Sequence, residues 1–143
     1  MRGFVVDASV AVKWLVAEPF SEQAATLLKP DLTLIAPELI FAESANALWA
    51  MHRRGDLSKA DLAEAVDVLK AAPIAVPFTV RQLAASASRL AVELEHPVYD
   101  CFYLALAVQE QYPVVTSDRR FHDIVRSHPY LADRMVHVRD VRI

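Results

Sequence analysis

Short apolar runs alternate with longer mixed segments along the chain, and this alternation predicts an ordered series of strands and helices. Five runs of three to five residues are apolar almost throughout, at residues 4–6, 32–36, 74–76, 114–116 and 135–138. Runs of this length without polar alternation are typical of buried parallel strands. We therefore expect a mostly parallel sheet that is covered on both faces.

The segments between these runs have the length and the end signals of helices. We expect helices over residues 8–17, 19–28, 38–54, 58–71, 79–95, 99–111 and 121–125. Ser9 can cap the first helix, Gly55 follows the third at a position that favours left-handed backbone, and Ser58 can cap the fourth. Strands that alternate with helices predict an α/β sandwich, with helical layers on both sides of the sheet.

Length and composition bound the class of protein. The chain has 143 residues, of which 55% are hydrophobic and 23% charged, as expected for one ordered domain over residues 1–143. The longest stretches without charge, such as residues 71–80, are too short to span a membrane, and the first apolar run is too short for a signal peptide. The single cysteine, Cys101, excludes an internal disulfide and a thiolate metal cluster and favours the cytoplasm.

Charge is distributed unevenly along the chain. The net charge of −3 argues against a protein that coats nucleic acid by bulk attraction. Residues 1–118 carry 9 basic and 15 acidic groups, whereas residues 119–143 carry 6 arginines and 3 aspartates. Every basic residue after Lys70 is an arginine, whose planar guanidinium group suits phosphate. The C-terminal segment is therefore either a solvated surface or a phosphate-binding one.

Two acidic residues directly follow predicted strands. Asp7 comes after the run at 4–6, and Asp118 comes two residues after the run at 114–116. Ligands of parallel α/β sheets bind beyond the carboxyl ends of the strands. We expect Asp7 and Asp118 to meet at one edge of the sheet if these strands are neighbours. Either residue alone could instead cap the helix that follows it.

Two more acidic residues interrupt apolar helical segments. Glu43 lies within the helix predicted at 38–54, and Asp100 lies in the most apolar stretch of the chain, at 98–107. A carboxylate among apolar residues is costly unless a partner neutralises it. Asp100 also lies in a first helical turn, where negative charge is favoured. The simpler roles are a surface or arginine-paired position for Glu43 and a capping position for Asp100.

Four carboxylates in one cleft would repel one another, so that either some take up protons or a cation lies among them. The sequence has no cysteine cluster and no closely spaced histidine pair, which leaves oxygen ligands that suit Mg²⁺ or Mn²⁺. Such an ion can activate water for attack on phosphorus. The hypothesis drawn from the residues is metal-assisted hydrolysis of a phosphodiester.

Four segments resemble, in order, the motifs of PIN-domain ribonucleases. They are Val5-Val6-Asp7-Ala8-Ser9, residues 37–48 with Glu43 three residues before Asn46-Ala47-Leu48, residues 99–107 with Asp100, and Val115-Thr116-Ser117-Asp118 with Phe121 downstream. No single motif is specific, but the ordered set covers nearly the whole chain. The size and the single domain resemble the VapC toxins of bacterial and archaeal VapBC toxin–antitoxin pairs.

The resemblance implies a PIN-like three-layer α/β/α sandwich and an acidic cluster that binds Mg²⁺ or Mn²⁺ and cleaves RNA endonucleolytically. The cluster would consist of Asp7, Glu43, Asp100 and Asp118. Ser9 and Thr116 match positions that keep a hydroxyl near the cluster, and Asn46 matches a polar residue that orients the second acid. The implied partners are a small antitoxin, whose C-terminal segment blocks the cleft, and a second copy of the chain in a homodimer.

Arginines close to the fourth acid are candidates for binding RNA. Arg119, Arg120 and Arg126 follow Asp118, and they could contact phosphates at the rim of the cleft. The alternative is that they are solvated surface residues. Asp123 is either an additional acid of the site or a surface acid beside these arginines.

Three other functions remain open from the sequence. The first is an RNA-processing nuclease of the same fold without an antitoxin. The second is a phosphate-accepting receiver module with Mg²⁺, which the absence of any lysine after Lys70 disfavours. The third is a binding domain with a structural metal. The sequence does not identify the RNA target, because all RNAs present the same phosphate chemistry.

Overall fold

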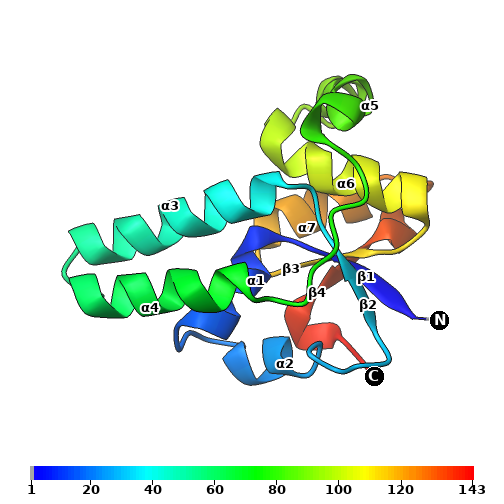
Figure 1. Cartoon of the computed structure of the whole chain (residues 1–143). Coiled ribbons are helices and arrows are strands. Elements are labelled where there is room, and N and C mark those ends of the chain that lie inside the picture. Colours follow the sequence, from blue (N-terminus) through cyan, green and yellow to red (C-terminus); the bar gives the residue numbers. More distant parts are fainter. Residues whose placement is uncertain (1) are drawn as a thin grey trace.

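A parallel sheet lies at the centre of the molecule (Figure 1). The computed structural model describes residues 2–143, so that Met1 of the predicted domain lies outside the described residues. Within this range the sheet has four strands in the order β2-β1-β3-β4, all parallel. The strands are β1 (Gly3–Val6), β2 (Thr33–Ile35), β3 (Val114–Thr116) and β4 (Met135–His137). The predicted parallel sheet is therefore confirmed.

Helices cover both faces of this sheet. They are α1 (Ala8–Leu15), α2 (Ser21–Ala25), α3 (Leu39–Arg53), α4 (Lys59–Lys70), α5 (Val80–Leu94), α6 (Val98–Glu110) and α7 (Arg119–Arg126), with 3₁₀ turns η1 (Ala132–Arg134) and η2 (Val138–Asp140). Helices α1 and α2 lie on one face and α6 and α7 on the other (Figure 1), the arrangement expected for right-handed crossovers in this strand order. This arrangement confirms the predicted three-layer sandwich.

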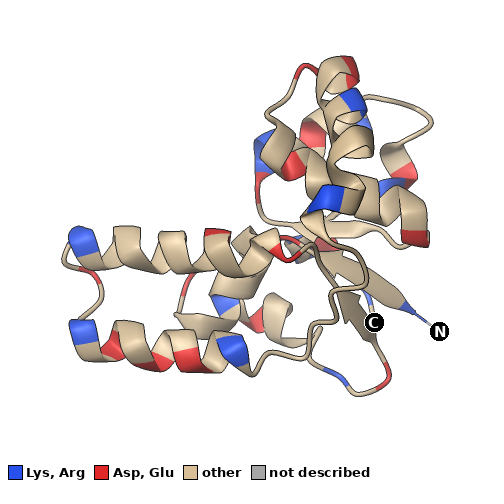
Figure 2. Cartoon of the chain, turned by 45° about the horizontal axis from the view of Figure 1, so that its top comes forward, with Lys and Arg blue, Asp and Glu red and all other residues tan. Residues whose placement is uncertain are grey.

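Helices α3 and α4 form an antiparallel hairpin that projects beside the sheet and packs on α1 (Figure 1). Charged residues are frequent along α4, which faces solvent over much of its surface (Figure 2). By contrast, residues 101–107 of α6 are all buried. The most apolar stretch of the sequence is thus the central helix of one layer, and it brings Asp100 close to the sheet.

Around the α3–α4 turn, the residues predicted to end α3 and to cap α4 have these roles in the structure. Gly55 has a left-handed φ of 85°. The amide of Gly55 donates to His52 O at 3.0 Å, and that of Asp56 donates to Met51 O at 2.9 Å. This pair of bonds is a Schellman motif, which satisfies the last carbonyls of α3. Ser58 accepts a hydrogen bond from Asp61 N at 3.0 Å and caps α4.

Three predictions about elements are wrong. The strand predicted at 74–76 is reduced to a single bridge between Ile35 and Ala75, because the prolines at 73 and 77 interrupt pairing. The helix predicted at 19–28 is helical only at α2, since Phe20 has a φ of 71° and ends the preceding turn. Ser9 does not cap α1, because Asp7 holds the N-cap position and Ser9 lies one residue inside the helix.

No helix within residues 2–143 combines the length and the apolar character that crossing a membrane requires.

Candidate active site

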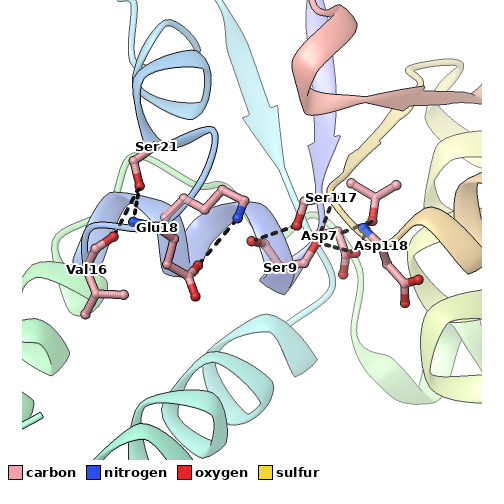
Figure 3. Close-up of polar contacts among 9 residues, drawn as sticks. Asp7, Ser9, Val16, Glu18, Ser21, Ser117 and Asp118 are labelled. Atoms are coloured by element: carbon pink, nitrogen blue, oxygen red, sulfur yellow. Dashed lines mark hydrogen bonds and ion pairs between the residues drawn. The ribbon is translucent and has the colours of Figure 1, made fainter. Parts of the chain in front are cut away.

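The acidic residues gather at the carboxyl edge of β1 and β3. These two strands are hydrogen-bonded neighbours, and the chain leaves them in opposite directions, toward β2 from β1 and toward β4 from β3. Such a point, where the direction of the connections changes, leaves a crevice at the strand ends. Asp7 ends β1 and Asp118 follows β3, so that both lie at this edge (Figure 3).

Hydroxyl groups from two segments hold the Asp7 side chain. Thr116 Oγ1 donates to Asp7 Oδ2 at 2.6 Å, and Ser9 Oγ donates to the same oxygen at 3.0 Å. The amide of Ser117 donates to Ser9 Oγ at 3.0 Å, which fixes that hydroxyl in turn (Figure 3). Asp7 is only 5% exposed and makes no side-chain capping bond to α1. The side chain is therefore held at this sheet edge by neighbouring hydroxyls, and capping is not its role.

The pKa of Asp7 is raised to about 7. Burial is the main cause, because the charged carboxylate loses its hydration, and the charges of Asp100 and Glu43 add to the rise. The bonds from Thr116 and Ser9 act in the opposite direction. An ionised Asp7 is therefore unfavourable in the protein alone, and a nearby cation would relieve this cost.

Tyr103 of α6 positions Glu43 of α3. Its Oη donates to Glu43 Oε1 at 2.6 Å, across 60 residues of sequence, and the tyrosine is fully buried. The pKa of Glu43 is raised mainly by burial and further by the charge of Asp100, while the bond from Tyr103 lowers it. Burial also raises the pKa of Tyr103 beyond its ordinary value, so that its hydroxyl stays protonated and remains a donor.

His96 positions Asp100 from the residues just before α6. Its Nε2 is hydrogen-bonded to Asp100 Oδ2 at 2.7 Å. The imidazole is buried and stacks on the ring of Phe121, with centroids 5.2 Å apart and planes at 14°. Burial raises the pKa of Asp100, His96 lowers it, and the charge of Asp118 raises it. Among residues 2–143, His96 Nδ1 has no hydrogen-bond partner.

Asp118 is the most exposed of the four acids and serves as the N-cap of α7. Its Oδ1 accepts a hydrogen bond from Phe121 N at 3.2 Å, which is the simpler role that the sequence left open for it. Its amide donates to Thr116 Oγ1 at 3.0 Å. Asp118 is nevertheless close enough for its charge to act on Asp100.

The four acids therefore interact electrostatically, although their side chains do not form a preassembled group of metal ligands. Asp7 is coupled to Glu43 and Asp100, and Asp100 to Asp118. Over residues 2–143, however, no three His, Cys, Asp or Glu side chains lie together in a way that could hold a metal ion. One oxygen each of Glu43, Asp100 and Asp118 is engaged by Tyr103, His96 and the Phe121 amide.

The chemistry of these donors fits a hard divalent cation. All of them are carboxylates, and burial together with mutual repulsion raises the pKa of Asp7, Glu43 and Asp100. Mg²⁺ commonly keeps several waters and takes only one or two protein carboxylates. A complete set of protein ligands is therefore not required for the acids at this edge to bind it.

Two residues of the site, Tyr103 and His96, were missed in the sequence. Helical spacing points to Tyr103, which follows Asp100 by three residues within α6, whereas His96 lies before α6 and its signal is its nearness to Asp100 in the sequence. Asn46, which the resemblance assigns to orienting Glu43, is exposed and makes no hydrogen bond to it in the described part of the chain. Tyr103 takes that position instead.

The predicted arginines differ in their surroundings. Arg119 and Arg120 are exposed in the first turn of α7, directly after Asp118. Arg126 is also exposed, but its Nη1 donates to Ala132 O at 3.1 Å. Asp123 is exposed and accepts a hydrogen bond from the ring of the adjacent His122 at 2.8 Å.

Comparison with known proteins identifies similar chains. The sequence profile described as PIN domain matches residues 4–126. The VapBC2 structure of Rickettsia felis, bound to a DNA fragment from its promoter, has a TM-score of 0.66 and 15% identity, covering 94% of this chain and 98% of that chain. VapC20 of Mycobacterium tuberculosis, a Sarcin-Ricin loop cleaving toxin, has a TM-score of 0.62 and 17% identity, covering 84% and 93%.

A third structure is similar to the same extent. VapBC-1 of nontypeable Haemophilus influenzae has a TM-score of 0.62 and 12% identity, covering 96% of this chain and 99% of that chain. Likenesses at these identities show a shared fold. No curated protein sequence matches the chain significantly.

Proposed function

The chain belongs to the PIN domain family, and from this premise we propose that it is a metal-dependent endoribonuclease and the toxin of a VapBC-type toxin–antitoxin pair. The observation that carries the proposal is the meeting of Asp7, Glu43 and Asp100, from three distant segments, at one sheet edge, with pKa values raised mainly by burial and further by neighbouring acids. The family also removes the receiver-module alternative, which has a different fold. The cytoplasm is the proposed compartment.

The proposed cofactor is Mg²⁺, with Mn²⁺ as a substitute. Asp7, Asp100, Glu43 and Asp118 would hold it, and when bound it supplies an activated water for attack on phosphorus and stabilisation of the departing oxygen. The neighbouring residues orient the acids. Thr116 and Ser9 fix one oxygen of Asp7, Tyr103 fixes one of Glu43, and His96 fixes one of Asp100.

The proposed substrate is RNA, bound in part through its phosphates. Arg119 and Arg120 are exposed beside Asp118, where they can contact phosphates on either side of the cleaved bond. Arg126 lies one to two turns further along α7 and would reach a more distant phosphate. Arginine suits this role because its guanidinium group binds phosphate oxygens in pairs.

The proposed protein partners are a small antitoxin and a second copy of the chain. The similar structures from Rickettsia felis and Haemophilus influenzae are VapBC structures, which supports an antitoxin partner. A cavity of about 630 Å³ lies between the end of α1 and the α3–α4 hairpin. Its lining combines apolar residues such as Met51 and Val68 with four acids and one arginine, namely Glu18, Asp56, Asp61, Glu64 and Arg54. A partner segment with apolar and basic side chains would complement this surface.

The proposed activity is tested by replacing Asp7 or Asp100 with Asn and measuring cleavage of a mixed RNA substrate. We expect cleavage to fall at least ~100-fold in both variants, because each loses a negative oxygen needed beside the cation. Cleavage by the unchanged protein should stop with chelator and return with Mn²⁺. Sequencing of RNA ends in cells that express the unchanged protein or Asp7→Asn would then identify the target.

The matched control is Asp67→Asn, which removes an exposed acid of α4 and should leave cleavage unchanged. Circular dichroism checks that each variant is folded. Full cleavage by Asp7→Asn, or cleavage that persists in chelator, would refute the proposed chemistry. Cleavage without any neighbouring antitoxin gene would retain the nuclease and reject the toxin role.

A further inference from the structure

A shallow pocket opens directly beside Glu43. Its volume is about 330 Å³. Its lining consists of Leu39, Ala42, Glu43, Asn46 and Ala47 from α3 and Tyr99 from α6. The pocket is thus continuous with the acidic edge on the α3 side, through Glu43, and on the α6 side, because Tyr99 immediately precedes Asp100.

Tyr99 is an aromatic residue that lies outside the buried core. Its side chain is 61% exposed, whereas the helix it begins is buried from residue 101 to 107. In the described part of the chain Tyr99 makes no hydrogen bond and no ring contact. Exposed tyrosines with no partner are common at surfaces that bind a flat apolar group, because the ring offers a large contact area at low entropic cost.

We propose that this pocket is a nucleobase subsite, in which the Tyr99 ring stacks on one unpaired base of the RNA next to the phosphate at the acidic edge. The inference rests on the proposed ribonuclease function. Asn46 lies in the same lining and is exposed, so that its amide can donate to and accept from the edge of the stacked base.

The charge of the pocket favours a base over a phosphate. Glu43 contributes a carboxylate to the lining, and none of its described residues is a lysine or an arginine. A phosphate would be repelled at this position, whereas a neutral base on an aromatic ring and small apolar side chains would not. The base must be unpaired, because in a duplex both of its faces are covered by neighbouring bases.

The position of the pocket favours the RNA over a protein segment. Tyr99 and Glu43 line the pocket together, and Glu43 lies close enough to Asp100 for the two charges to interact, so that a nucleotide bound at the acidic edge can reach the pocket. The large cavity at the α3–α4 hairpin, by contrast, shares no lining residue with this pocket among the described residues. Each surface can therefore be tested separately.

The experiment measures binding of a fluorescently labelled single-stranded RNA by anisotropy in chelator, where no cleavage occurs. The proteins are wild type, Tyr99→Ala and Tyr99→Phe, with Tyr130→Ala as the matched control because Tyr130 is 63% exposed and lies outside the pocket. We expect Tyr99→Ala to bind ~5- to 150-fold more weakly, the cost of one lost stack, and Tyr99→Phe and Tyr130→Ala to bind nearly as well as wild type. An RNA with 5-iodouridine beside the cleavage position should photo-crosslink to Tyr99.

Each other outcome overturns the subsite. Wild-type affinity for Tyr99→Ala, with cleavage by the wild type intact, rejects the subsite and keeps the nuclease. Equal losses in Tyr99→Phe and Tyr99→Ala reject stacking. If Tyr99→Ala weakens binding of an antitoxin peptide and leaves RNA binding unchanged, the pocket belongs to the protein partner. If the wild-type protein neither binds nor cleaves RNA, the proposed ribonuclease function itself is wrong.

Discussion

Hydroxyl groups and one imidazole set the orientation of the carboxylates at the residue scale. Asp7 is bound by two hydroxyls, Glu43 by a tyrosine and Asp100 by a histidine. Each bond leaves one oxygen of its carboxylate fixed in direction while the other can face a cation. Groups of this kind are known to tune metal sites because they fix the ligand before the metal arrives.

Replacing Tyr103 with Phe should loosen Glu43 without changing the net charge. The bond from Tyr103 lowers the pKa of Glu43, so that its loss should raise this pKa further and favour the protonated form. We expect the affinity for Mn²⁺, measured by isothermal titration calorimetry at neutral pH, to fall ~10- to 100-fold. The loss should be smaller at higher pH, where Glu43 is ionised in both proteins.

Tyr130→Phe is the control for this prediction. Tyr130 is exposed, and its ring contacts His128 and not Glu43. A Tyr103→Phe protein with unchanged Mn²⁺ affinity at every pH would show that the tyrosine serves packing alone.

At the scale of helices and strands, backbone conformation at the end of an element decides how the chain reverses. Helix α3 carries Glu43 and projects with α4 as a hairpin, so that its direction depends on how the chain reverses at Gly55. The turn is made by one residue with positive φ and two backbone bonds to the last carbonyls of α3. A Cβ atom at this position would meet no described atom within 4 Å. Glycine is therefore favoured here by the backbone conformation and not by lack of space.

Gly55→Ala should therefore destabilise the protein through its backbone. We expect the free energy of unfolding to fall by ~1–2 kcal/mol, the cost of left-handed backbone for a residue with a Cβ. Gly55→Asn should cost less, since asparagine tolerates this conformation. Urea denaturation measures both. Equal stability of the wild type and Gly55→Ala would mean that the turn adopts another conformation at no cost.

At the scale of the whole molecule, acidic residues from distant segments lower the free energy of unfolding when no cation is bound. Asp7 is buried beside two other carboxylates, and its pKa lies about 7 instead of 3.8. Between these two pH values the folded protein binds a proton at Asp7 that the unfolded chain releases. The free energy of unfolding therefore falls as the pH rises through this window, and it is constant above it as far as Asp7 is concerned.

Asp7→Asn should remove this pH dependence. A shift of this size corresponds to ~4 kcal/mol for one group, so we expect the variant to gain stability relative to wild type by a few kcal/mol between pH 4 and pH 8. Urea denaturation in chelator at several pH values measures the difference. Mg²⁺ should stabilise the wild type at pH 8 and have little effect on Asp7→Asn.

Asp67→Asn controls for the removal of an exposed acid and should follow the wild-type pH profile. Parallel profiles for wild type and Asp7→Asn would contradict the assignment of a raised pKa to Asp7.

Much of the architecture could be read from local pattern. The order of strands and helices, the parallel sheet, the glycine at the end of α3 and the serine cap of α4 were all predicted. These features depend on the spacing of apolar residues and on end signals within a few residues of one another. The strand expected at 74–76 is reduced to one bridge because the prolines on either side of it interrupt pairing, a local signal that its apolar run outweighed in the prediction.

The sequence by itself determined which residues carry charge at strand ends and in apolar helices, because those features are local. Only the tertiary structure decided that β1 and β3 are neighbours, that Tyr103 reaches Glu43 across 60 residues, and that His96 stacks on Phe121 while it binds Asp100. Such contacts join segments that are far apart in the chain. They are fixed by the packing of helices on the sheet, which no short stretch of sequence encodes.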